Sequence, residues 1–146
     1  MPGLILNIKP GERFLVNGVV LENGPKRAQI RVETEGASIL RLSDALHPDD
    51  VNTPVKRVYY IAQLILTGDS DEAEAKELLI KSIKDLQNVF RDTAKAPLEK
   101  ALNAAEIGRY YSVLCSLKHV FPLEEKLLNL RLPQSEIETE KQSEVA

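Results

Sequence analysis

Residues 54–66 are mostly apolar and divide a strand-like N-terminal part (the front) from a helical C-terminal part (the back) of the chain. Apolar side chains fall on nearly every face of a helix drawn through this stretch, and Gln63 is the only polar residue of its second half. Thr53 and Pro54 are a typical helix start, because a threonine hydroxyl accepts an unpaired backbone N–H and proline lacks that donor. Gly68 is a typical helix end. We therefore expect a helix that is buried on nearly every side.

The front has strand character in five short segments, which are residues 4–8, 12–16, 19–22, 26–33 and 38–42. Turn residues separate them. Pro10 and Gly11 favour a type II turn, because proline suits its second position and glycine its third. Asn17 and Gly18 favour a type I′ hairpin turn, because both residues tolerate the left-handed conformation.

Two of these segments alternate between apolar and polar positions, as half-buried strands do. Residues 26–33 place Ala28, Ile30 and Val32 on one face, and residues 38–42 place Leu40 and Leu42 on one face with Ile39 and Arg41 on the other. A sheet of this size rarely closes a stable core alone. We expect it to need the helices, or its copy in another subunit.

The back predicts further helices. Residues 69–71 cap a second helix, whose apolar stripe consists of Ala75, Leu78, Leu79, Ile83, Leu86, Val89 and Phe90. Pro97 starts a third helix that Gly108 kinks or ends, and Pro122 precedes a last short one. From Pro133 onward the sequence is polar and acidic, which is typical of a disordered tail.

Together these elements predict an α+β protein with a small N-terminal antiparallel five-stranded sheet followed by a C-terminal helical bundle. We expect a strand-rich module over residues 1–46, a helical module over residues 47–132 and an acidic tail over residues 133–146.

Composition narrows the classes of function. The 146 residues are 43% hydrophobic and 5% aromatic, and the formal net charge is −3. Residues 1–43 hold six Lys and Arg against four Glu; this excess permits an anionic partner, and it also fits an ordinary solvated surface. The sequence shows neither a signal peptide nor an apolar run near the ~20 residues of a membrane span. We expect a cytoplasmic protein.

Catalytic signatures are missing from the sequence. Cys115 is the single cysteine, which excludes an intrachain disulfide, and its apolar neighbours favour a buried structural thiol. Cys115 and His119 stand one helical turn apart, but Leu117 and Val120 beside them favour a packed core over a catalytic pair. We expect no enzyme activity, metal or cofactor. The residues alone favour a binding module.

Two segments carry a family resemblance: KPGERFLVNGVV at residues 9–20 and LHPDDVNTPVKRVYYIAQLIL at residues 46–66. In these segments, and over nearly its whole length, the chain resembles the flagellar-biosynthesis repressor family FlbT. The resemblance implies a post-transcriptional regulator that acts on the untranslated leader of flagellin mRNA and lowers its translation and lifetime. It also implies the small flagellar protein FlaF as a counterpart. Some members of the family act as activators instead.

A second resemblance covers only the front third. LILNIKPGE at residues 4–12, the five short strands and the helix after them are similar to the carbon-storage regulator CsrA. That family implies two chains with interlaced strands, whose first and last strands form an edge that grips single-stranded RNA. Leu6, Lys9 and Arg41 match its RNA-facing positions, whereas Ile8 stands where that family has a basic residue.

Two hypotheses of function follow. In the first, the front sheet binds single-stranded leader RNA, and the candidate contacts are Leu6, Lys9, Arg13, Lys26, Arg27, Arg31 and Arg41. Taken singly, Arg31 and Arg41 fit an ordinary solvated strand face equally well.

In the second hypothesis the chain is an adaptor or chaperone-like module that binds a flagellar protein. The candidate residues for that partner, or for another subunit, are Tyr59, Ile61, Leu64 and Ile65. The scarcity of aromatic residues outside the helices favours this hypothesis, because RNA-binding proteins often stack bases on aromatic rings. In either case the open sheet edges predict a homodimer or larger assembly.

Overall fold

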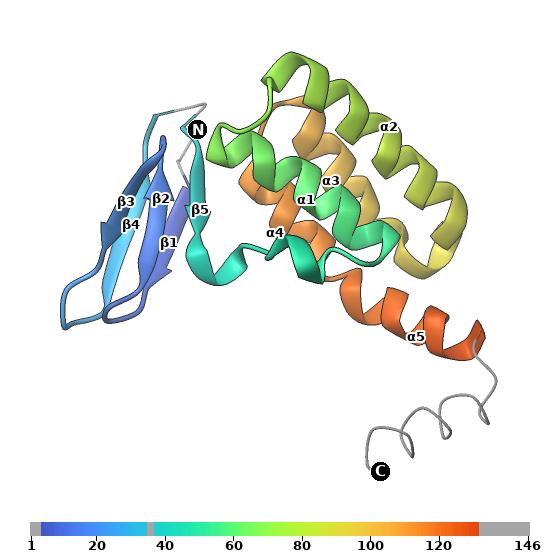
Figure 1. Cartoon of the computed structure of the whole chain (residues 1–146), viewed down its shortest axis with the longest axis horizontal. Helices are drawn as coiled ribbons and strands as arrows, with labels where there is room; N and C mark the ends of the chain where they lie inside the picture. Colours follow the sequence, from blue (N-terminus) through green and yellow to red (C-terminus); the bar gives the residue numbers. More distant parts are fainter. Residues whose placement is uncertain (1–3, 35–36, 132–146) are drawn as a thin grey trace, which may run out of the picture.

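The computed structural model describes residues 4–34 and 37–131, which form a strand region packed against a bundle of helices (Figure 1). The strands are β1 (Leu4–Ile8), β2 (Arg13–Val16), β3 (Val19–Glu22), β4 (Ala28–Val32) and β5 (Ile39–Arg41). The helices are α1 (Pro54–Thr67), α2 (Glu72–Phe90), α3 (Lys95–Glu106), α4 (Tyr110–Lys118) and α5 (Phe121–Arg131). Short 3₁₀ turns cover Leu42–Asp44, Pro48–Asp50 and Arg91–Ala94. The α+β class is confirmed, and the expected tail over residues 133–146 lies outside the described residues.

The strands form two sheets, so the prediction of a single five-stranded sheet is wrong. β1 pairs with β4, and β2 lies between β3 and β5, all antiparallel. Alternation along a strand fixes which residues share a face, but it does not specify which strand lies beside it. The Arg41 guanidinium joins the two sheets by donating to the backbone oxygen of Asn7 at 2.8 Å.

The expected turns are present. Asn17 and Gly18 have φ values of 48° and 84°, as a type I′ turn requires. Gly11 has a φ of 70°, and the Glu12 N–H donates to the Lys9 carbonyl at 3.1 Å. The Asn17–Gly18 turn sets the register of β2 and β3, whereas the turn at Gly11 leads the chain from one sheet into the other.

Helix α1 begins and ends as predicted. The Thr53 hydroxyl accepts from the Lys56 N–H, and Gly68 takes the left-handed conformation after the last turn. Seven of the helix residues are buried, including Val55, Tyr59 and the polar Gln63. The helix packs against α2 and α4, but Pro54 and Arg57 are exposed, so it is buried on fewer sides than the sequence predicted.

Helix α2 differs from the prediction in the width of its buried stripe. Asp71 caps it through the Glu74 N–H, as the sequence indicated. Leu78 and Val89, however, are 53% and 60% exposed, while Leu79 and Ile83 are fully buried. Helical spacing gives the direction of an apolar stripe, but the neighbouring helices decide how much of it they cover. Leu78 and Val89 lie outside the part of the stripe that the neighbouring helices cover.

A connector over residues 42–53 links the strand region to α1 and is bonded to the helices at Asp44 and Leu46. The Gln63 side chain accepts from the Leu46 N–H at 2.7 Å and donates to the Leu46 carbonyl at 3.0 Å. The Tyr59 hydroxyl donates to the Asp44 carbonyl at 2.5 Å. These contacts satisfy buried polar groups on both sides and fix the strand region against the bundle.

Helix α5 extends from one corner of the bundle (Figure 1). The ring of Phe121 packs on Tyr59 with centroids 5.1 Å apart. Glu124, only 4% exposed, accepts from the Val55 N–H at 2.8 Å and so caps the N-terminus of α1 from a distance. This carboxylate satisfies a buried donor that Thr53 does not reach.

Candidate functional site

The turns at one end of the strand region are held together by Asn23. Its side-chain amide donates to the carbonyls of Lys9 at 2.8 Å and Lys26 at 2.9 Å. The Gly11 N–H adds a bond to the Gly24 carbonyl at 3.1 Å. We call the two joined segments, residues 9–11 and 23–27, the basic turns. The sequence predicted a turn at Asn23, Gly24 and Pro25 but not the bonds of the Asn23 side chain, although asparagine beside Gly-Pro is typical of such side-chain-to-backbone bonding.

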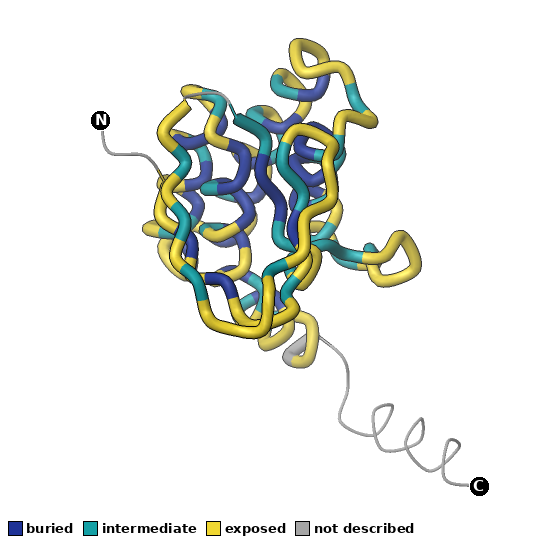
Figure 2. The backbone as a smooth tube through the Cα atoms, turned by 90° about the vertical axis from the view of Figure 1, so that its left-hand side faces the viewer, coloured by how far each residue is buried: buried dark blue, intermediate teal, exposed yellow. Residues whose placement is uncertain are grey.

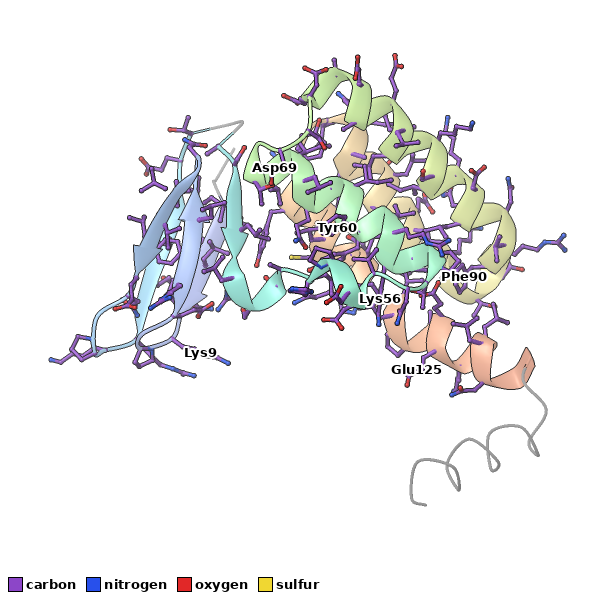
Figure 3. The ribbon with its side chains drawn as sticks, viewed as in Figure 1. Lys9, Lys56, Tyr60, Asp69, Phe90 and Glu125 are labelled. Atoms are coloured by element: carbon purple, nitrogen blue, oxygen red, sulfur yellow. The ribbon has the colours of Figure 1, made fainter. Side chains whose placement is uncertain are left out.

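Three cations lie on the basic turns: Lys9, Lys26 and Arg27. All three are exposed, and within residues 4–34 and 37–131 none has a carboxylate in ion-pair contact. Figure 3 shows Lys9 at the lower end of the strands. Figure 2, which looks onto the strand side, shows the exposed turns at this end. The structure thus brings together three of the seven predicted RNA contacts.

Arg41 is not on a free surface, which corrects the prediction that it faces RNA. Its guanidinium donates to both carboxylate oxygens of Glu12, at 2.6 and 2.8 Å, as well as to Asn7. The hydrogen bond from Arg41 is the main reason that the pKa of Glu12 is lowered to about 2, and burial of the carboxylate opposes it. Because both faces of β5 are covered, the Arg41 side chain serves as a clasp between the sheets.

Arg13 and Arg31 have different surroundings. Arg13 pairs with Glu22 across the β2–β3 hairpin at 3.1 Å, with both side chains exposed. Arg31 lies on β4 opposite Ile5 and is exposed, as the alternation predicted. On the same face of this sheet the Gln29 amide donates to Asn7 at 3.1 Å. Arg31 is therefore available on an outer face that also carries amide side chains.

Leu6 does not have an RNA-facing position. It is 4% exposed and Ile8 is 2% exposed, and both belong to the hydrophobic core. Their side chains point inward because β1 covers the core with the opposite face to that of Ile5 and Asn7. Of the three residues that match RNA-facing positions of CsrA, which are Leu6, Lys9 and Arg41, only Lys9 is therefore exposed on the surface.

Asp44 collects the polar contacts between the connector and α4. Its carboxylate accepts from the Tyr111 hydroxyl at 2.8 Å and from the Lys118 ammonium. Burial, followed by the bond to Asp44, raises the pKa of Tyr111 far above its ordinary value, so the hydroxyl is a permanent donor. This cluster joins the two halves of the molecule.

Cys115 and His119 are both exposed, so the prediction of a buried thiol in a packed core is wrong. Cys115 lies on α4, and His119 follows the last residue of that helix. Partial shielding from water, and then the charge of Asp44, raise the pKa of the Cys115 thiol. The group is therefore a protonated thiol at neutral pH and has none of the activation that a catalytic cysteine needs.

The residues proposed for a partner interface on α1 differ in exposure. Tyr59 and Ile65 are 0% and 7% exposed and lie inside the chain's own core. Ile61 and Leu64 are half-buried at its margin. An interface through α1 stays a prediction, and in this conformation only Ile61 and Leu64 offer surface for it.

A cavity of about 540 Å³ lies between the strand region and the helices, lined by apolar residues such as Ile39 and Ile65 and by polar ones such as Glu72. The Tyr110 hydroxyl on its wall donates to Glu72 at 2.9 Å, and burial raises the pKa of Tyr110. Among the residues that the structure describes, the lining contains neither histidine nor cysteine. These groups do not form a nucleophile and base.

Residues 4–34 and 37–131 contain no group of three His, Cys, Asp or Glu side chains arranged to hold a metal ion. Within the same residues, none of the helices combines the length and apolar character needed to cross a membrane.

Comparison with known proteins gives a family. The model of the family described as "Flagellar protein FlbT" matches residues 4–128. The chain is similar to a "Probable flagellum biosynthesis repressor protein FlbT" from Allorhizobium ampelinum, with 32% identity over 130 residues, covering 86% of this chain and 84% of that protein. It is also similar to the "Flagellum biosynthesis repressor protein FlbT" of Caulobacter vibrioides, with 27% identity over 126 residues, 86% of this chain and 89% of that protein.

No solved structure matches the chain, so the resemblance to CsrA stays an expectation. The family match extends from β1 into α5 and includes the basic turns, the connector and all of α1. The chain belongs to the FlbT family.

Proposed function

We propose that this chain represses flagellum biosynthesis in the cytoplasm by binding the untranslated leader of flagellin mRNA and lowering its translation and lifetime. Membership in a family whose relatives are named flagellum biosynthesis repressors supports the regulatory role. The observation that supports RNA as the target is the set of exposed cations on the basic turns, Lys9, Lys26 and Arg27.

The basic turns suit phosphate groups better than the rest of the strand region does. Arg13 and Arg41 already have carboxylate partners, whereas Lys9, Lys26 and Arg27 project from turns that Asn23 holds in place. Arg31 and the amides of Asn7 and Gln29 lie on an adjoining strand face and offer hydrogen bonds to unstacked bases. We therefore infer that the RNA backbone contacts the turns and its bases contact the outer face of β1 and β4.

The test replaces Lys9, Lys26 and Arg27 by Ala together and measures binding to flagellin leader RNA as salt is varied. If all three contact phosphates, affinity falls and the slope of log K against log salt decreases by about 2, because each contact with a single strand contributes about 0.7. The matched control replaces Lys81, Lys84 and Lys100, which are exposed on α2 and α3 and carry the same charge. Equal losses in both triple variants would mean nonspecific attraction and would contradict the proposal.

A second candidate function is that of an adaptor that binds a flagellar protein such as FlaF and affects the message indirectly. The observation that favours it concerns the four Tyr and three Phe residues of the chain, none of which is exposed. The strand region therefore offers no ring on which bases could stack. Crosslinking the purified chain to leader RNA with and without FlaF separates the two: crosslinks that require FlaF would favour the adaptor.

A further inference from the structure

Strand β3 is an exposed apolar edge strand. It lies at the border of the three-stranded sheet, on the side of the molecule away from the helices (Figure 1). All four of its residues are exposed, with values of 57% for Val19, 58% for Val20 and 41% for Leu21. Edge strands usually carry Lys, Pro or a bulge that prevents pairing with another chain. β3 has none of these, and its register with β2 is continuous.

The register determines which backbone groups of β3 are unused. The type I′ turn closes on the pair Val16 and Val19, which is hydrogen-bonded in a two-residue hairpin. Hydrogen-bonded pairs then recur at every second position. The bond from the Asn23 N–H to the Glu12 carbonyl at 2.9 Å agrees with this, because Asn23 lies four residues after Val19. The N–H and C=O groups of Val20 and Glu22 consequently point away from β2, toward solvent.

These outward groups suit a second copy of the same strand. In an antiparallel pair across a two-fold axis, Val20 can lie opposite Val20, Val20 opposite Glu22, or Glu22 opposite Glu22. The first register also sets Val19 opposite Leu21 and Glu22 opposite Gly18, so apolar residues meet and like charges stay apart. The third sets two carboxylates opposite each other, which is unfavourable. The second leaves a carboxylate against a valine.

We propose that β3 pairs with β3 of a second copy of this chain, antiparallel and with Val20 opposite the same residue of the other copy. The pairing joins two three-stranded sheets into one continuous sheet and removes the exposed edge from both. It brings Val19, Val20 and Leu21 of each copy into contact. The proposal does not depend on RNA binding: the two sets of basic turns lie at opposite ends of the joined sheet.

The first test is Val20→Pro in the full chain. Proline removes the outward N–H of residue 20 but no bond to β2, and edge strands tolerate it at such positions. Light scattering at micromolar concentration should give a dimer for the natural chain and for Val20→Thr, and half that mass for Val20→Pro with unchanged circular dichroism. A natural chain that is monomeric, or a folded Val20→Pro variant that stays dimeric, would overturn the proposal.

A second test covers the case in which Val20→Pro does not fold, and it also tests the register. In a Cys115→Ser background, Val20→Cys places two thiols at directly opposite positions, where Cα atoms about 5.5 Å apart allow a disulfide. Glu22→Cys places them four residues apart along the strands, about 13 Å. Under mild oxidation a linked dimer should accumulate with Val20→Cys and not with Glu22→Cys. The reverse result, or linkage in neither, would contradict this pairing.

Discussion

The strand region and the helical bundle are stabilised in different ways. Among the described residues, five of the buried apolar side chains belong to strands, and twenty-two lie between Val55 and Val120. The strand region depends instead on polar contacts such as the Glu12–Arg41 pair and the Asn23 amide. The difference shows why charge alone did not identify binding residues: in a region with a small core, part of the charge holds the fold.

The largest effect on stability is expected in the bundle. Leu79→Ala removes a side chain that is 0% exposed and leaves a cavity, which should cost about 3 kcal/mol in the free energy of unfolding. Leu78→Ala is the matched control, since Leu78 is 53% exposed and should change the same quantity by less than about 0.5 kcal/mol. Urea denaturation of both variants measures the difference, and equal costs would mean that the face of α2 is assigned wrongly.

In the strand region the largest effect is expected from Glu12→Gln, about 2 kcal/mol at pH 7, because it removes the charged partner of the half-buried Arg41. The pKa of Glu12 is about 2 when folded, against an ordinary value of 4.5, so the stabilisation is complete above the ordinary value. It is lost as the pH falls from 4.5 toward 2. Urea midpoints across this range should fall less steeply in the variant than in the natural chain.

Glu22→Gln is the comparison for that experiment. The pair of Glu22 with Arg13 is more than half exposed on both sides, and such pairs contribute little. Its unfolding free energy should stay within about 0.5 kcal/mol of the natural chain at pH 7. If Glu22→Gln lost as much unfolding free energy as Glu12→Gln, the Arg13–Glu22 pair would contribute as much to stability as the Glu12–Arg41 pair.

A smaller effect is expected where α5 meets α1. Glu124→Gln keeps an oxygen that can accept from the Val55 N–H but removes the negative charge at the helix N-terminus, which should cost about 1 kcal/mol. Glu125→Gln, an exposed neighbour, should have almost no effect. Thermal unfolding followed by circular dichroism distinguishes the two, and identical melting temperatures would mean that Glu124 does not act as a cap.

The smallest effect on stability is expected from Arg31→Ala, within about 0.5 kcal/mol, because its side chain is exposed. If Arg31 contacts RNA, leader binding should weaken nonetheless. Arg41→Ala should do the reverse and lower stability, since it leaves Glu12 without its partner. Unfolding and RNA binding are measured for both variants. If Arg31→Ala and Arg41→Ala changed stability and RNA binding alike, the assignment of a binding role to Arg31 and a structural role to Arg41 would be contradicted.

Local features of the fold could be read from the sequence, whereas contacts between distant segments could not. The Asn17–Gly18 turn, the Thr53 and Asp71 caps and the Gly68 stop are fixed by residues within one turn of each other. The pairing of β1 with β4 and the Glu12–Arg41 pair, 29 residues apart, depend on which faces meet in three dimensions.

The candidate site shows the same difference between local features and contacts of distant segments. Lys9 was predicted from the CsrA resemblance, and Lys26 and Arg27 were predicted as cations of the basic front. All three lie on exposed turns, where no neighbouring strand has to be placed before exposure can be inferred. Leu6 and Arg41 were assigned wrongly because their burial depends on the second sheet and on β5, which the pattern did not place. Cys115 was taken as buried because its neighbours in sequence are apolar, but the exposed side of α4 is set by the packing of α1 and α3.

The bonded connector has a consequence for how the molecule unfolds. Separating the strands from the helices would break the bonds of Gln63 to Leu46, Tyr59 to the Asp44 carbonyl and Tyr111 to the Asp44 carboxylate. All four bonds would be lost together, each at a net cost of about 0.5–1.5 kcal/mol. The connector therefore couples the melting of the strands to that of the helices. The chain should lose its strands and helices in one cooperative transition, with equal calorimetric and van't Hoff enthalpies.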